Sequence, residues 1–108
     1  MKKLFVYGLL QEERLQRRLF NRTIEQEPHE LTGFAISDKL VNGLYKTIVP
    51  DFGDSITKGT ILYLEDEELE ITDRFEGVSH GLYTRTHIKQ DYTGGSDFDV
   101  YIHEVTWE

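Results

Sequence analysis

The sequence contains no cysteine and very little proline, methionine or tryptophan. Its 108 residues include two prolines, one methionine and one tryptophan. Without cysteine, the chain can form neither a disulfide nor a thiolate metal site, and this absence fits a reducing compartment. A chain of this length can build one hydrophobic core without covalent cross-links, so we expect residues 1–108 to form a single domain.

Long apolar runs are also missing. Near the N-terminus, Met1-Lys2-Lys3 precedes only the short apolar run Leu4–Tyr7, which Gly8 interrupts. That run is too short for the core of a signal peptide, and no other run is long enough to cross a bilayer. We therefore expect a cytoplasmic protein that does not bind membranes.

Positive charge is scarce, with 12 Lys and Arg residues against 20 Asp and Glu residues and a net charge of -8. Because an acidic chain repels phosphate backbones, the composition predicts no nucleic-acid partner. The basic cluster at Arg14, Arg17 and Arg18 follows Glu12 and Glu13 directly. Since Glu13 can pair with Arg17 at helical spacing, we interpret this cluster as a solvated helix face.

Metal-binding residues lack a recognisable spacing. The four histidines are scattered through the chain, at His29, His80, His87 and His103. None of them forms a paired-ligand spacing of the kind that zinc sites use. The sequence therefore predicts no functional metal site.

What the chain does contain is a series of short apolar segments separated by turns. Apolar runs and alternation predict strands at 3–7, 31–37, 58–64, 82–87 and 98–103, and helices at 11–20 and from Asp66 to a cap at Gly77. Asn42-Gly43 predicts a further hairpin, and residues 21–30, which include Pro28, are expected to be a loop. The pattern is typical of an α+β fold with a small, mostly antiparallel β-barrel and about two short helices.

Glu76 has an unusual setting among the acids of this chain. Phe75 precedes it and Gly77-Val78 follow, whereas most other acids lie in polar runs. A carboxylate that is partly removed from water has a raised pKa, which suits a general base or acid near neutral pH. The alternative is a helix-end carboxylate that faces solvent.

The first predicted strand ends at Gly8, and a helix follows directly. Such a turn presents backbone N–H groups, and the start of the helix favours anions. Gly8 also allows a ligand to approach closely because it has no side chain. The alternative is an ordinary strand-to-helix connection.

Four segments of the chain together resemble a known family. They are Phe5–Leu10, Gly43–Pro50, Gly59–Tyr63, and Asp73–Gly77 with Tyr83–Arg85 behind it. In this order they resemble the gamma-glutamylcyclotransferase-like family, and more narrowly its short gamma-glutamylamine cyclotransferase type. The resemblance implies a small mixed barrel with no metal or cofactor. It also implies cleavage of a gamma-glutamyl amine or peptide by its own α-amine, giving 5-oxoproline and a free amine.

The resemblance assigns roles to particular residues. Glu76 is the expected general acid and base, and the expected substrate-binding residues are Tyr7, Gly8, Leu9, Leu10, Tyr45, Tyr83 and Arg85. Backbone N–H groups of the turn would bind the oxyanion or the substrate carboxylate. Packing alone is the alternative for the two later tyrosines, and a surface ion pair is the alternative for Arg85.

Two positions depart from the family pattern. Leu9 stands where the family usually has Ser or Thr, and Lys46 stands where it often has Pro. These differences leave a second hypothesis open, a module that binds a small carboxylate metabolite in the same pocket without turnover. A third hypothesis, a protein-interaction domain that uses its acidic surface, has only the net charge in its favour.

Overall fold

The computed structural model describes residues 1–38, 40–41, 46–51, 53, 55–90 and 96–102. The hairpin predicted at Asn42-Gly43 and the candidate site residue Tyr45 lie outside these ranges.

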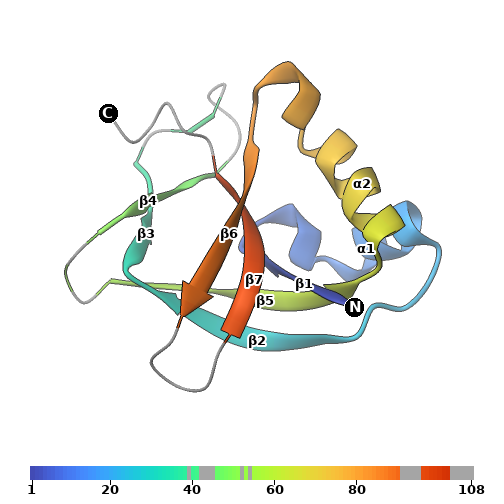
Figure 1. Cartoon of the computed structure of the whole chain (residues 1–108), viewed down its shortest axis with the longest axis horizontal. Helices are drawn as coiled ribbons and strands as arrows, with labels where there is room; N and C mark the ends of the chain where they lie inside the picture. Colours follow the sequence, from blue (N-terminus) through green and yellow to red (C-terminus); the bar gives the residue numbers. More distant parts are fainter. Residues whose placement is uncertain (39, 42–45, 52, 54, 91–95, 103–108) are drawn as a thin grey trace.

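A five-stranded sheet forms the centre of the described structure (Figure 1). Its strands, in spatial order, are β2 (Gln26–Thr32), β5 (Ile56–Leu64), β1 (Lys2–Val6), β7 (Ser96–Ile102) and β6 (Thr84–Gln90). The β1–β7 pair is parallel and the other three pairs are antiparallel. A separate ladder joins β3 (Phe34–Ile36) to β4 (Ile48–Pro50).

The α+β class and the mixed, mostly antiparallel sheet are therefore confirmed, but the sheet is not closed. Strands β2 and β6 lie at its two edges, and among the described residues no ladder joins them. The expected barrel is thus an open, curved sheet (Figure 1).

The prediction of a loop at 21–30 was wrong from Gln26 onward, because β2 begins there. Leu31 is the one fully buried side chain of this strand, so the strand lacks the apolar alternation that would identify it in the sequence. An edge strand also tolerates Pro28, because the missing N–H group can lie on its unpaired side.

Two α-helices were expected, and the described residues contain two: α1 (Glu13–Phe20) and α2 (Asp66–Phe75). A 3-10 turn, η1 (Leu9–Gln11), precedes α1, and a second one, η2 (Val78–His80), follows α2. In Figure 1 both helices lie towards one end of the sheet, whereas β3 and β4 lie at the other end.

The alternation of side chains along β1 divides the core into two clusters. Leu4 and Val6 pack with Phe20 of α1 and Leu69 of α2 on the helical face. Phe5 points the other way and packs with a second cluster that includes Phe98 of β7. Successive residues of a strand face opposite sides, so a central strand with apolar residues on both faces must be covered on both.

The start of α2 is fixed by a capping box and an ion pair. The Glu68 carboxylate accepts a bond from the backbone N–H of Glu65 at 2.8 Å. It also accepts two bonds from the Arg22 guanidinium, both at 2.7 Å. These contacts tie the helix to the chain that enters β2, and so they fix the direction in which α2 runs towards Glu76.

Candidate functional site

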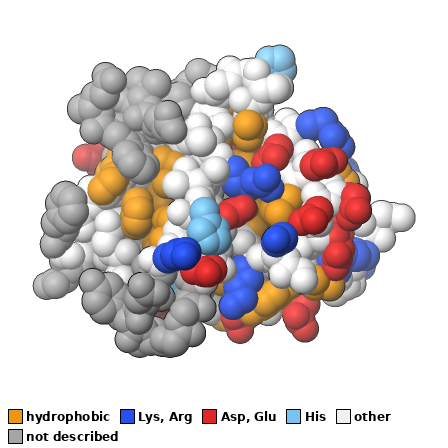
Figure 2. Space-filling model, viewed as in Figure 1, with side chains coloured by type: hydrophobic (Ala, Val, Ile, Leu, Met, Phe, Trp, Pro, Cys, Tyr) orange, Lys and Arg blue, Asp and Glu red, His pale blue; other side chains and the backbone are white. Residues whose placement is uncertain are grey.

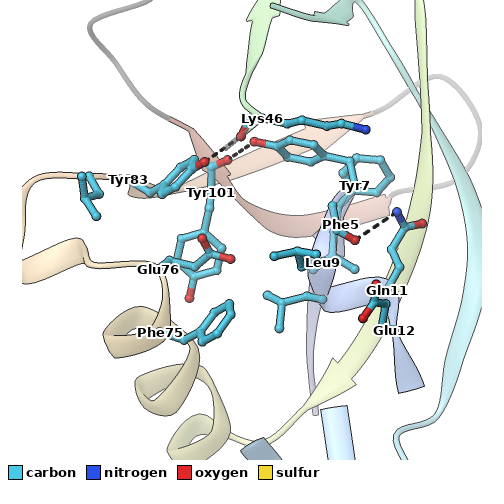
Figure 3. Close-up of a pocket in the computed structure, with 14 residues that line it drawn as sticks. Phe5, Tyr7, Leu9, Gln11, Glu12, Lys46, Phe75, Glu76, Tyr83 and Tyr101 are labelled. Atoms are coloured by element: carbon cyan, nitrogen blue, oxygen red, sulfur yellow. Dashed lines mark hydrogen bonds between the residues drawn. The ribbon is translucent and has the colours of Figure 1, made fainter. Parts of the chain in front are cut away.

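A cavity of about 840 Å³ opens between the end of β1 and the end of α2 (Figure 3). Its volume lies at the large end of the range of about 300–1,000 Å³ that small-molecule sites occupy. The lining residues come from these two ends, from β7 and from the segments that precede β4 and β6. They are Phe5, Val6, Tyr7, Gly8, Leu9, Leu10, Gln11, Glu12, Lys46, Phe75, Glu76, Leu82, Tyr83 and Tyr101.

Glu76 is the residue at which α2 ends. Its N–H group still bonds to the Thr72 carbonyl at 2.8 Å, and Gly77 then turns the chain away with a φ of 69°. A left-handed residue at this point favours glycine, and a Cβ atom on Gly77 would lie 2.7 Å from Leu82. The turn therefore holds the Glu76 carboxylate at the cavity (Figure 3).

Burial raises the pKa of Glu76 to about 7, and desolvation is the cause. Among the described residues, no cation or hydrogen-bond donor is paired with this carboxylate. A glutamate with this pKa exchanges protons readily near neutral pH, which is what general acid–base chemistry requires.

The opposite wall is the Gly8 turn. The N–H groups of Gln11 and Glu12 bond back to the carbonyls of Gly8 and Leu9 at 3.1 Å and 3.0 Å. Within the described structure, the N–H groups of Gly8, Leu9 and Leu10 donate to no protein acceptor. A Cβ atom on Gly8 would meet open space. The turn therefore offers backbone donors to a ligand that can approach closely.

Three tyrosines wall the cavity, and their hydroxyl groups are already donating. Tyr7 donates to the carbonyl of Tyr101 at 2.7 Å, and Tyr83 donates to the carbonyl of Lys46 at 2.7 Å. Tyr101 donates to the Asp73 carboxylate at 2.6 Å. Desolvation is the main reason that the pKa values of Tyr7 and Tyr101 lie well above the usual tyrosine range. These side chains are therefore fixed, neutral walls.

Arg85 does not line this cavity. Its Nε atom lies 3.5 Å from Asp73 and 3.6 Å from Asp99, so it forms ion pairs with carboxylates of α2 and β7. The structure thus brings Glu76, Tyr7–Leu10 and Tyr83 together around one cavity. Arg85 lies outside the lining, beside Asp73 and Asp99.

Sequence reasoning missed several lining residues, of which Tyr101 is the most informative. Tyr101 alternates with the core residues Val100 and Ile102, so its side chain faces the helical side of the sheet. That alternation was visible in the sequence. Its position beside α2 was not, because it depends on the parallel pairing of β1 with β7, which begins at Leu4 and Asp99.

A metal site, a membrane-spanning helix and a charged surface patch are three other features that would indicate a function. In the described ranges, no group of three or more His, Cys, Asp or Glu side chains is arranged to hold a metal ion. No helix of the described chain is long and apolar enough to cross a membrane. On the face shown in Figure 2, basic and acidic side chains lie intermixed. The predicted ion pair between Glu13 and Arg17 is present on the surface, where Arg17 Nη2 lies 2.9 Å from Glu13 Oε1.

Known proteins resemble this chain over most of its length. A sequence model of the family described as gamma-glutamyl cyclotransferase, AIG2-like, matches residues 4–106. AIG2-like protein C of Arabidopsis thaliana is 30% identical over 99 residues, which are 92% of this chain and 57% of that protein. The chain therefore spans less than two thirds of this relative's length.

Two solved structures show the same fold. The solution structure of an Arabidopsis thaliana protein superposes with a TM-score of 0.79 at 23% identity, over 99% of this chain and 64% of the other. A structure named gamma-glutamyl cyclotransferase superposes with a TM-score of 0.77 at 17% identity, over 94% of this chain and 65% of the other. At these identities the likeness concerns the fold alone.

Proposed function

Because the chain belongs to the gamma-glutamyl cyclotransferase, AIG2-like family, we propose that it converts a gamma-glutamyl amine or peptide into 5-oxoproline and a free amine. The observation that carries this proposal is the position of Glu76, whose pKa of about 7 is due to desolvation. Its carboxylate shares one cavity with the backbone donors of the Gly8 turn.

The proposed reaction needs only proton transfer and ring closure. Ionised Glu76 takes a proton from the substrate α-ammonium, and the free amine attacks the side-chain carbonyl carbon. A new C–N bond closes the five-membered ring, and the carbonyl oxygen becomes an oxyanion. The oxyanion then returns to a carbonyl as the C–N bond to the leaving amine breaks, and that nitrogen receives the proton from Glu76. The ring nitrogen still carries a second proton, which passes to the Glu76 carboxylate and leaves the neutral amide of 5-oxoproline. No electrons are gained or lost, and no water is consumed.

The residues of the cavity match these steps. A general base is most effective when its pKa is near the working pH, and a positioned group of this kind contributes about 10²–10⁴-fold in rate. The N–H groups of Gly8, Leu9 and Leu10 can stabilise the oxyanion or hold the substrate carboxylate. Ring closure of a flexible substrate also depends on orientation, which the fixed tyrosine walls would impose.

The test is to incubate the protein with gamma-glutamyl amines and dipeptides and to measure 5-oxoproline. We expect Glu76→Gln to reduce the rate by about 10²–10⁴-fold, because glutamine cannot accept the proton. Glu70→Gln is the matched control, since Glu70 is an exposed acid on the same helix. Equal turnover by both variants would remove Glu76 from the mechanism.

The non-catalytic alternative depends on the same free N–H groups, which can hold a carboxylate without Glu76. It predicts that the wild-type protein binds 5-oxoproline or a gamma-glutamyl amide in a calorimetric titration but releases no amine. That result across a broad gamma-glutamyl panel would replace the enzyme hypothesis with the binding module.

A further inference from the structure

Two of the large apolar side chains that the described chain leaves exposed belong to the cavity. Leu9 is 55% exposed and Phe75 is 42% exposed, and both line it. Single exposed apolar residues are common on protein surfaces. Two that border the same hollow are more informative, because apolar surface in a concave site is what a ligand covers.

These two residues lie beside the groups that would perform the chemistry. Phe75 directly precedes Glu76 on α2, and Leu9 directly follows Gly8 in η1. Figure 3 shows Phe75 on the α2 side of the cavity and Leu9 on the β1–η1 side. Leu82, which is half-buried, adds further apolar surface to the lining.

This arrangement identifies the part of the substrate that would contact them. In the proposed reaction the leaving nitrogen must lie within hydrogen-bond reach of Glu76, while the carbonyl oxygen faces the N–H groups of the Gly8 turn. A substituent on the leaving nitrogen would then extend past Phe75 and Leu9. The cavity of about 840 Å³ has room for a substituent beyond the gamma-glutamyl group.

Building on the proposed function, we infer that Leu9 and Phe75 select gamma-glutamyl amides whose leaving amine carries a bulky apolar group. Apart from Glu76, the charged side chains that line the cavity do not favour a charged leaving amine, because Lys46 and Glu12 are of opposite sign and both are exposed to water. Apolar contact is therefore the stronger source of selectivity at this end of the site.

The test compares two gamma-L-glutamyl amides of similar length, the isopentylamide and the 4-aminobutylamide. We expect kcat/KM for the apolar amide to exceed that for the cationic amide by about 10–200-fold, the range over which apolar pockets discriminate. Leu9→Ser and Phe75→Ser should each reduce this ratio about tenfold. Leu40→Ser is the matched control, because Leu40 is 47% exposed and lies outside the cavity lining.

The possible outcomes separate this inference from the proposed function. Turnover of both amides with a ratio near one, or a preference for the cationic amide, would overturn the inference and leave the cyclotransferase proposal intact. A ratio that falls equally in Leu40→Ser would also overturn it. No turnover of either amide would overturn the inference, and no turnover across the broad gamma-glutamyl panel would overturn the cyclotransferase proposal as well.

Discussion

Tyr101 of β7 donates a hydrogen bond to Asp73 of α2 across 2.6 Å, and this bond joins the sheet to the helix turn that ends at Glu76. Tyr101 is 4% exposed, so its hydroxyl group has little access to water. Arg85 lies 3.5 Å from the same Asp73 oxygen. The wall of the cavity beside Glu76 is therefore held by a partly buried polar contact as well as by apolar packing.

Removing the acceptor Asp73 should lower the free energy of unfolding more than removing the donor hydroxyl group of Tyr101. Asp73→Ala leaves a buried tyrosine hydroxyl group unpaired, and we expect it to lower the free energy of unfolding by about 1–3 kcal/mol. Tyr101→Phe removes that hydroxyl group while Asp73 keeps its pairing with Arg85, so a loss nearer 1 kcal/mol is expected. Urea unfolding at pH 7 measures both values.

The double variant tests whether the two side chains are coupled. If the bond stabilises the fold, the two single variants lose the same interaction. The sum of their decreases in the free energy of unfolding should then exceed the decrease measured for the double variant. Strictly additive losses would show that Tyr101 and Asp73 contribute independently, which would contradict the role assigned to their contact.

Gly8 gives a prediction that separates binding from folding. A Cβ atom at Gly8 would meet open space, so a side chain can be added at this position without a clash. We therefore expect Gly8→Val to fold with near-wild-type stability while its side chain enters the cavity. A displaced substrate should lose about 10²-fold in kcat/KM. A fully active Gly8→Val would show that the substrate does not approach this turn.

Much of the architecture follows from local sequence pattern. The strand that ends at Gly8, the apolar faces of β5 and the helix that ends at Gly77 were all predicted, because periodicity and glycine act over a few residues. The edge strand β2 was missed because its side chains are mostly exposed and it contains Pro28. Its pairing with β5 is a long-range contact that leaves little trace in the local pattern.

In the candidate site, too, local features could be predicted from the sequence and long-range contacts could not. Glu76 and the Gly8 turn could be selected from neighbouring residues and from the family resemblance. The partners of Arg85 could not, because Asp73 and Asp99 lie on different elements, which meet only in the folded chain. The opposing positions of Leu9 and Phe75 likewise depend on where α2 ends relative to β1.

The ion pair at the start of α2 should stabilise the fold without taking part in turnover. The Arg22 guanidinium lowers the pKa of Glu68, chiefly through its hydrogen bonds. We expect Glu68→Ala to lower the free energy of unfolding by about 1–3 kcal/mol at pH 7. Because the folded-state pKa is depressed, this contribution is present above the unfolded pKa and is lost as the pH falls through the folded one. A loss that is unchanged at acidic pH would contradict this origin.

Glu76 should show the opposite dependence on pH in the unfolding of the wild-type protein. Its folded-state pKa of about 7 is raised from 4.5, so the folded chain binds more protons than the unfolded chain between these values. The free energy of unfolding therefore falls as the pH rises through this window. The same ionisation should produce an acid limb near pH 7 in kcat/KM, since only the ionised carboxylate can accept a proton.

Glu76→Gln tests this directly, because glutamine has no charge to desolvate. At pH 4 the carboxyl group is largely protonated in both states, so the variant and the wild-type protein should unfold with similar free energies. At pH 8 the variant should be more stable, by at most about 3 kcal/mol at roughly 1.4 kcal/mol for each pKa unit. Urea unfolding at both pH values measures the difference, and Glu70→Gln should show no such change.

A Glu76→Gln variant that loses turnover but is more stable than the wild-type protein at pH 8 would show that Glu76 serves catalysis and destabilises the fold. The opposite result would be a variant whose free energy of unfolding, relative to that of the wild-type protein, is lower at pH 8 than at pH 4. It would mean that the Glu76 carboxylate has a stabilising partner and is not held unpaired at the cavity.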